Sequence, residues 1–200
     1  MEYLIWIIIG YFSGSILFGY LVPKLFLNID VRKISKDGNP GTYNAMMYGG
    51  KKIGILVAAL DVLKGMIPVM VARQFLNVAN PLFSLVVAAP CIGHGYSIFS
   101  KFKGGKCLGI SYGLMLGLLP ERLPLLLLCF SFLFYNYIAV ITPHFCRSIA
   151  IYSTVSIFVI FSHVVLGIKL GVILVCLIVI RKHIHSMKGL QFKINWFNKA

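Results

Sequence analysis

The sequence is poor in charged residues and especially in acidic ones. Only 12% of its 200 residues are Asp, Glu, Lys or Arg, and 5 acidic side chains stand against 19 Lys and Arg, for a formal net charge of +14. With 59% hydrophobic residues and a mean hydropathy of +0.90, the chain cannot bury its apolar surface in one water-soluble core. These values predict an integral membrane protein with anionic partners such as membrane lipids. Nucleic acid is not expected, because the sequence has no basic soluble domain.

Other features are also missing. The five cysteines are scattered, mostly in apolar runs, so neither a disulfide framework nor a zinc site is expected. No basic leader precedes the first apolar run, which is too long for a signal-peptide core, so we expect this run to stay as a membrane helix. Because no internal repeat, low-complexity tract or soluble linker divides the sequence, residues 1–200 are predicted to form a single integral membrane domain.

Seven apolar stretches predict an all-α membrane protein, a bundle of about seven transmembrane helices of which some are short or broken. The stretches are 3–25, 53–72, 81–100, 108–119, 123–142, 148–164 and 166–180. The fourth is too short to cross about 30 Å of hydrocarbon at about 1.5 Å per residue. A five-helix alternative therefore stays open, in which residues 108–119 are re-entrant and residues 148–180 form one helix.

The distribution of lysine and arginine predicts the orientation. If the N-terminus is outside and the C-terminus is cytoplasmic, the outer loops receive only Arg73, Arg122 and Lys169, and nearly all other cations are cytoplasmic. This asymmetry follows the positive-inside rule. We therefore expect a multi-pass protein of the cell membrane whose cationic loops, and any active site in them, face the cytoplasm.

Two of these cytoplasmic loops combine glycine with cations. Residues 30–52 read "DVRKISKDGNPGTYNAMMYGGKK", and residues 101–106 read "KFKGGK". Glycines let backbone amides approach an anion closely, and lysines supply charge. Basic loops lying against anionic lipid heads are the simpler interpretation. However, the tight turn "DGNPG" between two basic clusters is more specific than lipid attraction requires.

Asp61, Lys64 and His94 are ionisable residues that lie inside apolar stretches. His94 precedes "KFKGGK" by about one to two helical turns, and both a hydrogen-bonded structural role and a role in a site stay open. Asp61 and Lys64 are spaced i, i+3 and therefore share one helix face. Because charges within a membrane face the protein interior or a wet cavity, we expect these two residues to pair for structural reasons.

The motifs occur in a recognisable order between Gly14 and Pro120: "GSILFGYLV", "DVRK", "GNPG" with Asn44, "GGKKIGIL", "LDVLKG", "GHGYSIFSKFKGGK" and "LPE". In this order they resemble the bacterial acyl-phosphate:glycerol-3-phosphate acyltransferases of the PlsY type. "GNPG" and "KFKGGK" are weak signals separately, and their joint occurrence is a strong one. The sequence contains no His-x-x-x-x-Asp, which excludes the histidine-based type of glycerophosphate acyltransferase.

The resemblance implies an enzyme that moves an acyl group from acyl phosphate to the 1-hydroxyl of glycerol-3-phosphate, giving lysophosphatidic acid and phosphate in phospholipid synthesis. It implies no cofactor and no metal. The protein would hold two phosphorylated substrates, neutralise them and orient a hydroxyl towards a carbonyl carbon. By resemblance the catalytic residues would be Asn39, His94, Lys106 and His183, and the phosphate-binding residues would be Ser35, Gly38, Gly41, Asn44, Lys103, Gly104 and Gly105.

Departures from the family pattern keep alternatives open. "SKDGN" is one residue longer than the usual "GSGN", so Ser35 is shifted, and Met47 stands where an arginine is expected. The C-terminal "RKHIHSMKG" lacks the family's asparagine, and His183 with His185 as a metal pair lacks acidic or cysteine partners. The alternatives are a paralogue that acts on another phosphorylated acceptor or is not catalytic, and a small transporter or scaffold.

Overall fold

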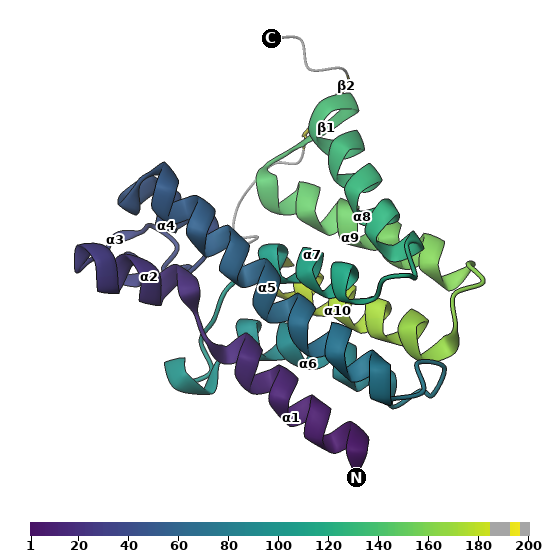
Figure 1. Cartoon of the computed structure of the whole chain (residues 1–200). Coiled ribbons are helices and arrows are strands. Elements are labelled where there is room, and N and C mark those ends of the chain that lie inside the picture. Colours follow the sequence, from purple (N-terminus) through teal and green to yellow (C-terminus); the bar gives the residue numbers. More distant parts are fainter. Residues whose placement is uncertain (185–192, 197–200) are drawn as a thin grey trace.

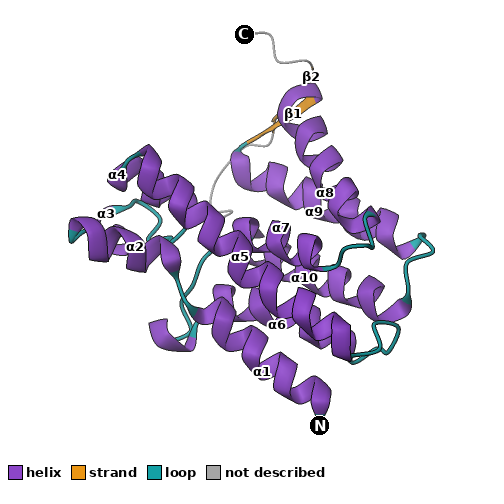
Figure 2. Cartoon of the chain, viewed as in Figure 1, coloured by secondary structure: helices purple, strands orange, loops and turns teal. Residues whose placement is uncertain are grey.

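The computed structural model describes residues 1–184 and 193–196, and Figures 1 and 2 show that helices dominate it. His185, Lys188 and Lys199 lie outside the described residues. The elements are α1 (Glu2–Ser15), α2 (Phe18–Leu27), α3 (Val31–Ile34), α4 (Thr42–Gly49), α5 (Lys51–Phe75), α6 (Phe83–Gly95), the 3-10 helix η1 (Ile98–Ser100), α7 (Leu108–Gly117), α8 (Leu123–Leu133), the π-helix η2 (Phe134–Ile138), β1 (Ala139–Thr142), α9 (His144–Ile160), α10 (Leu166–Ile184) and β2 (Lys193–Trp196).

The helical architecture was predicted, but a small β-ribbon was not. Strand β1 pairs with β2 in antiparallel register, with Ala139 opposite Trp196 and Thr142 opposite Lys193. The predicted helix 123–142 therefore ends early, because η2 follows α8 and the strand begins at Ala139. The residues of β1 include β-branched Val140, Ile141 and Thr142, and a proline follows them, a combination that disfavours helix and favours an extended chain.

The first apolar stretch was expected to be one helix, and the structure breaks it. Helices α1 and α2 are bent by 43° at a break over Ile16 and Leu17. Two carbonyl groups at the break accept hydrogen bonds from distant side chains: Ser97 Oγ, in the loop before η1, donates to the Ser15 oxygen, and Lys64 Nζ, on α5, donates to the Ile16 oxygen, each at 2.6 Å. Broken helices are tolerated at membrane depth when the protein satisfies the freed backbone groups.

Residues 148–180 form two helices and not one, which overturns this part of the five-helix alternative. Helix α9 ends at Ile160, and α10 begins at Leu166 and packs against both α9 and α6. By length and composition, α5 and the segment Phe83–Ser100 can each cross a membrane, and α1 with α2 is a third if the bent pair is one span. Three further apolar helical segments are shorter: Leu108–Gly117, Leu123–Ile138 and His144–Ile160.

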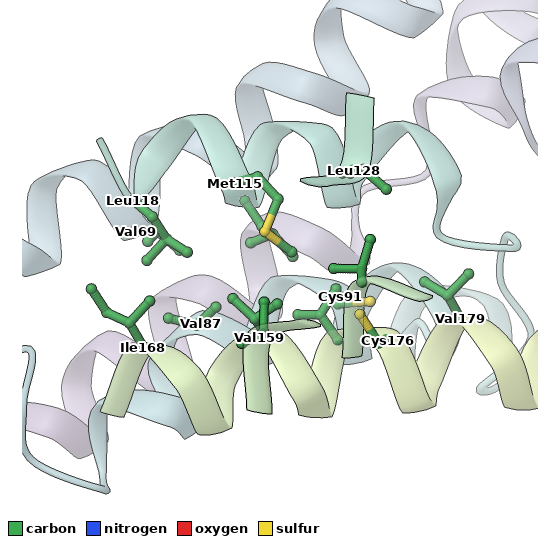
Figure 3. Close-up of a cluster of buried hydrophobic side chains, with 14 of the residues drawn as sticks. Val69, Val87, Cys91, Met115, Leu118, Leu128, Val159, Ile168, Cys176 and Val179 are labelled. Atoms are coloured by element: carbon green, nitrogen blue, oxygen red, sulfur yellow. The ribbon is translucent and has the colours of Figure 1, made fainter. Parts of the chain in front are cut away.

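The main buried cluster lies among α5–α10, and Figure 3 shows part of it, including Val87, Met115 and Val179. Cys91, Cys107 and Cys176 are buried as expected for small apolar residues, whereas Cys129 is exposed and Cys146 is partly buried. Large apolar side chains also cover the outside. Examples on α1, α5 and α8 are Ile5, Ile8, Phe12, Ile67, Met70, Leu126 and Phe130, which are all at least 41% exposed. A surface of this kind is suited to lipid.

Glycines bring the elements around the first loop into close contact. A Cβ atom added at Gly14 in α1 would overlap the backbone of Pro90 in α6, and one added at Gly19 in α2 would overlap the carbonyl of Pro40. The first contact joins α1 to α6, and the second holds the "GNPG" turn directly against α2. The end of α6, which carries His94, therefore lies near the first loop.

Candidate active site

A cavity of about 1120 Å³ opens where α3, the turn before α4, the loop after η1 and the end of α10 meet. Its lining holds six cationic and two acidic side chains, with the backbone of the two glycine-rich loops between them. The lining residues are Asp30, Arg32, Lys33, Asp37, Gly38, Asn39, Pro40, Tyr96, Ser100, Phe102, Lys103, Gly104, Lys106, Arg181, Lys182 and Ile184.

The two glycine-rich loops meet at the carboxylate of Asp37. Lys106 Nζ lies 2.8 Å from its Oδ2 in an ion pair. Asn44 Nδ2 donates to its Oδ1 at 2.8 Å, and the Asn39 backbone N–H donates to the same oxygen at 3.2 Å. Asn44 Nδ2 also donates to the Asn39 carbonyl at 2.8 Å, which closes the turn. The structure thus brings Asn39 and Lys106, which are far apart in sequence, to one cavity wall.

These contacts keep Asp37 ionised. Its partial burial alone would raise the pKa of the carboxyl, but the hydrogen bonds from Lys106 and Asn44 outweigh burial and hold the pKa below its usual value. The side chain is 44% exposed, and that of Lys106 is 29% exposed. The pair therefore stands at the wetted wall of the cavity.

At another part of the lining, Arg32 joins the first loop to the end of η1, directly before the second loop. Its Nε and Nη2 donate to the two carboxylate oxygens of Asp30, each at 2.9 Å, while Nη1 donates to Ser100 Oγ at 3.0 Å. The guanidinium also lies 3.5 Å from the ring centroid of Tyr20. The hydrogen bonds from Arg32 hold the pKa of Asp30 below its usual value, so this pair stays charged.

A dry cluster of charged residues lies behind the second loop. Lys64 Nζ is 2.8 Å from Asp61 Oδ1, and both side chains are at most 4% exposed, which confirms the predicted pair. The same ammonium donates to the Ile16 oxygen at 2.6 Å and contacts His94 Nδ1 at 2.8 Å. Because a charged lysine only donates, His94 Nδ1 accepts this bond, and the ring proton is on Nε2.

The second loop rests on His94. The Gly105 N–H donates to the His94 carbonyl at 2.9 Å. A Cβ added at Gly104 would overlap that carbonyl, and one added at Gly105 would overlap His94 Nε2. The glycines are therefore needed for close packing on the histidine. The Gly105 amide holds the loop in place and is not free to face an anion.

The predicted site residues divide into two groups. Gly38, Asn39, Lys103, Gly104 and Lys106 line the cavity. Six others are not among the lining residues: Ser35, Gly41, Asn44, His94, Gly105 and His183.

Two of these six residues have buried polar atoms without a hydrogen-bond partner in residues 1–184 and 193–196. His183 is 1% exposed, its Nδ1 bonds the Val179 carbonyl at 2.8 Å, and its Nε2 has no hydrogen-bond partner among the described residues. Ser35 Oγ is likewise buried without a partner in the described part of the chain. Gly41 caps the N-terminus of α4.

The cavity also has lining residues outside the two glycine-rich loops. Arg181 and Lys182 close the cavity from α10: Lys182 Nζ donates to the Gly95 oxygen at 2.8 Å, and Arg181 Nε donates to the Tyr96 hydroxyl at 3.2 Å. In the sequence, Arg181 and Lys182 are part of a basic cluster at the end of the last apolar stretch. Such clusters are common beside membrane helices and do not by themselves indicate a site. Asp37 was visible as the extra residue of "SKDGN". Among the described residues, no three His, Cys, Asp or Glu side chains converge to hold a metal.

The fold and the cavity define a helical membrane protein with a cationic site between two glycine-rich loops. The sequence profile of the glycerol-3-phosphate acyltransferase family matches residues 4–193. The chain belongs to this family.

Relatives and solved structures agree with the family. The chain is 44% identical over 108 residues to a glycerol-3-phosphate acyltransferase of Thermotoga petrophila, and 40% identical over 121 residues to one of Maridesulfovibrio salexigens. The matches span 54% and 60% of both chains, respectively, so the chain covers somewhat more than half the length of these relatives.

The structural similarity extends further along the chain. This chain is similar in structure to crystal structures of PlsY, an integral membrane glycerol 3-phosphate acyltransferase. The glycerol 3-phosphate form has a TM-score of 0.79 at 28% identity, and the lysophosphatidic acid form has a TM-score of 0.77 at 26% identity. Each match covers 94% of this chain and 90% of the other.

Proposed function

We propose that this protein transfers an acyl group from an acyl phosphate to the 1-hydroxyl of glycerol-3-phosphate, releasing lysophosphatidic acid and inorganic phosphate in phospholipid synthesis. The cationic cavity that Asn39 and Lys106 share carries the proposal, because both substrates bear phosphoryl groups. Family membership and the likeness to the glycerol 3-phosphate and lysophosphatidic acid forms of PlsY support it.

The proposed reaction needs charge compensation and positioning more than covalent chemistry. The hydroxyl oxygen attacks the acyl carbon, the bond from that carbon to the phosphate oxygen breaks, and the departing phosphate takes up the hydroxyl proton. Two phosphorylated ligands repel each other unless fixed cations and N–H groups offset their charge. We assign that task to Lys103 and Lys106, with the backbone N–H of Asn39 and the side-chain amide of Asn44. We assign to His94 the support of the Gly104–Gly105 segment.

The remaining site residues keep the roles that the family resemblance implies. Ser35, Gly38 and Gly41 belong to the first loop at the phosphate site, and His183, at the end of α10, keeps its catalytic role. We place the cavity on the cytoplasmic side of the membrane, with the N-terminus outside and seven apolar segments crossing, because the loops around the cavity hold most of the cations. Residues 1–200 act as one domain in this proposal.

One observation favours a second candidate function. Met47, at the position where the family pattern has an arginine, is 63% exposed on α4 and is not among the lining residues. A fixed bidentate ligand for phosphate is therefore missing from this position. A paralogue that uses a different phosphorylated acceptor would tolerate this loss.

Two measurements test these functions. Purified protein in detergent should release phosphate from acyl phosphate only when glycerol-3-phosphate is present. The gene should also restore growth to a bacterial strain that lacks its own glycerophosphate acyltransferase. Phosphate release that requires a different phosphorylated acceptor would establish the paralogue, and solute flux in liposomes without turnover would establish the transporter alternative.

A further inference from the structure

The carboxylate of Asp37 accepts hydrogen bonds from a set of donors that would also bind another anion. Three groups bond its carboxylate: Lys106 Nζ and Asn44 Nδ2 at 2.8 Å each, and the Asn39 N–H at 3.2 Å. The other acidic lining residue, Asp30, is paired with Arg32 through two hydrogen bonds of 2.9 Å. Asp37 differs from Asp30 because its donors come from both loops of the cavity.

These donors would serve a phosphoryl group equally well. A carboxylate and a phosphoryl group both accept charge-assisted hydrogen bonds from an ammonium and from amide N–H groups on two neighbouring oxygens. The turn is shaped for this contact, since Gly38 adopts a φ of +60° just before the Asn39 N–H that donates to Asp37. Without the Asp37 carboxylate, the donors of Asn39 and Lys106 would face the cavity, whose lining holds six cationic side chains including Lys106.

The contact between Asp37 and Lys106 can be exchanged at low cost. Their side chains are 44% and 29% exposed, so water and mobile ions already compete for them. Partly exposed ion pairs contribute little to stability. Asn44 has a second acceptor in the Asn39 carbonyl, at 2.8 Å, and that contact keeps its amide in place when Asp37 moves away.

We propose that Asp37 is an intrinsic ligand of the phosphoryl site, whose carboxylate occupies the donors of Asn39, Asn44 and Lys106 until the phosphoryl group of a substrate displaces it. The inference rests on the proposed function and identifies one of its binding subsites. Asp37 then sets substrate affinity. A dianionic phosphoryl group can replace its single charge, whereas a ligand with one carboxylate gains nothing by the exchange.

The direct test is the affinity of the purified protein in detergent for inorganic phosphate, measured by isothermal titration calorimetry. Asp37→Asn should lower the Kd about tenfold, since one charge-assisted contact no longer has to be broken before phosphate binds. Asp37→Ser, which has a shorter side chain, should change the Kd in the same direction. Lys106→Ala should raise it. Glu2→Gln changes the net charge equally at the exposed start of α1 and should leave the Kd unchanged.

Two further titrations distinguish the sources of the phosphoryl group. Glycerol-3-phosphate represents the acceptor, and a non-hydrolysable acyl phosphonate represents the donor. The ligand whose Kd falls in Asp37→Asn is the one that uses this subsite. If the Kd for inorganic phosphate is unchanged or higher in both Asp37 variants, the proposal is overturned, and a higher Kd would show that Asp37 instead orients Lys106. If phosphate binds as expected but turnover is absent, only the proposed function fails.

Discussion

Two aspartate–lysine pairs in this protein have the same separation and opposite surroundings. Asp61 and Lys64 lie 2.8 Å apart with side chains that are at most 4% exposed, whereas Asp37 and Lys106, also 2.8 Å apart, are 44% and 29% exposed. The buried pair cannot separate without leaving a charge in a dry interior, while water can take over either partner of the open pair. Burial, and not distance, therefore decides which pair is fixed and which can be exchanged for a ligand.

The fixed pair also supports the open one. Lys64 holds the Ile16 carbonyl at the break between α1 and α2, and it contacts His94, on which Gly105 rests. The loop that rests on this histidine, residues 101–106, ends at Lys106 in the wall of the cavity. The buried charged cluster thus supports the loop that carries Lys106.

The largest expected effect comes from breaking the buried pair. Lys64→Met leaves Asp61 without its cation in a dry interior and should destabilise the protein by about 3–5 kcal/mol. The measurement is thermal unfolding in detergent. Lys106→Met makes the same change in the open pair and should cost about 1 kcal/mol or less. Equal losses in the two variants would contradict the distinction between the pairs.

The next largest effect concerns turnover. Lys106→Ala should reduce acyl transfer by about 10²–10³-fold, the usual result of removing one group that stabilises transition-state charge, with little change in Tm. The matched control is Lys101→Ala, which removes a cation from the same loop but from a position outside the cavity lining. Phosphate release in the presence of glycerol-3-phosphate gives both rates. Full activity of Lys106→Ala would disprove the assigned role.

A third prediction tests the packing of Gly105 on His94, which connects the buried pair to the open pair. Gly105→Ala places a methyl group against His94 Nε2 and should cost about 1–3 kcal/mol of stability or displace the loop, with a fall in turnover. Gly109→Ala is the control, since its Cβ would meet Asp61 Cβ at 3.5 Å, an ordinary contact. Tm and activity measured side by side decide the result. A neutral Gly105→Ala would mean that the loop does not depend on close packing against the histidine.

The smallest effect is the pH dependence of the open pair. The pKa of Asp37 is lowered from 3.8, since hydrogen bonds from Lys106 and Asn44 outweigh the opposing effect of burial. A lowered pKa contributes stability above the unfolded value, and this contribution is lost as the pH falls through the folded pKa. The Tm difference between wild type and Asp37→Asn should therefore be constant near neutral pH and shrink only below about pH 4. A change in this difference between about pH 6 and pH 8 would contradict the assignment.

The sequence predicted the helical membrane class and the buried pair because both follow from local patterns. Long apolar runs need lipid, and the i, i+3 spacing of Asp61 and Lys64 fixes their shared face. It missed the break at Ile16, since the groups that satisfy the free carbonyls come from Lys64 and Ser97, in distant parts of the chain. It missed the ribbon for a similar reason, because β1 needs residues 193–196 as its partner.

For the site, the motifs indicated which loops line the cavity but not what each of their residues contacts. Lys103, Lys106 and Asn39 carry donors in recognisable glycine-rich strings, and all three line the cavity. Gly105 belongs to the same strings, yet its amide bonds the His94 carbonyl. Glycines in a loop sequence show that the backbone can come close to another group. Only the packing of the folded chain determines whether that group is a ligand or a protein atom.

By itself, the sequence determined the apolar composition and the positive net charge of this protein, from which lipid surroundings and anionic ligands were predicted. Composition and charge are properties of the chain in any conformation, so no fold is needed to derive them. The tertiary structure alone decided that Asp37 meets Lys106, that Arg181 and Lys182 close the cavity, and that His94 lies beneath the loop. These contacts join residues of different elements, and packing in three dimensions sets their distances and burial.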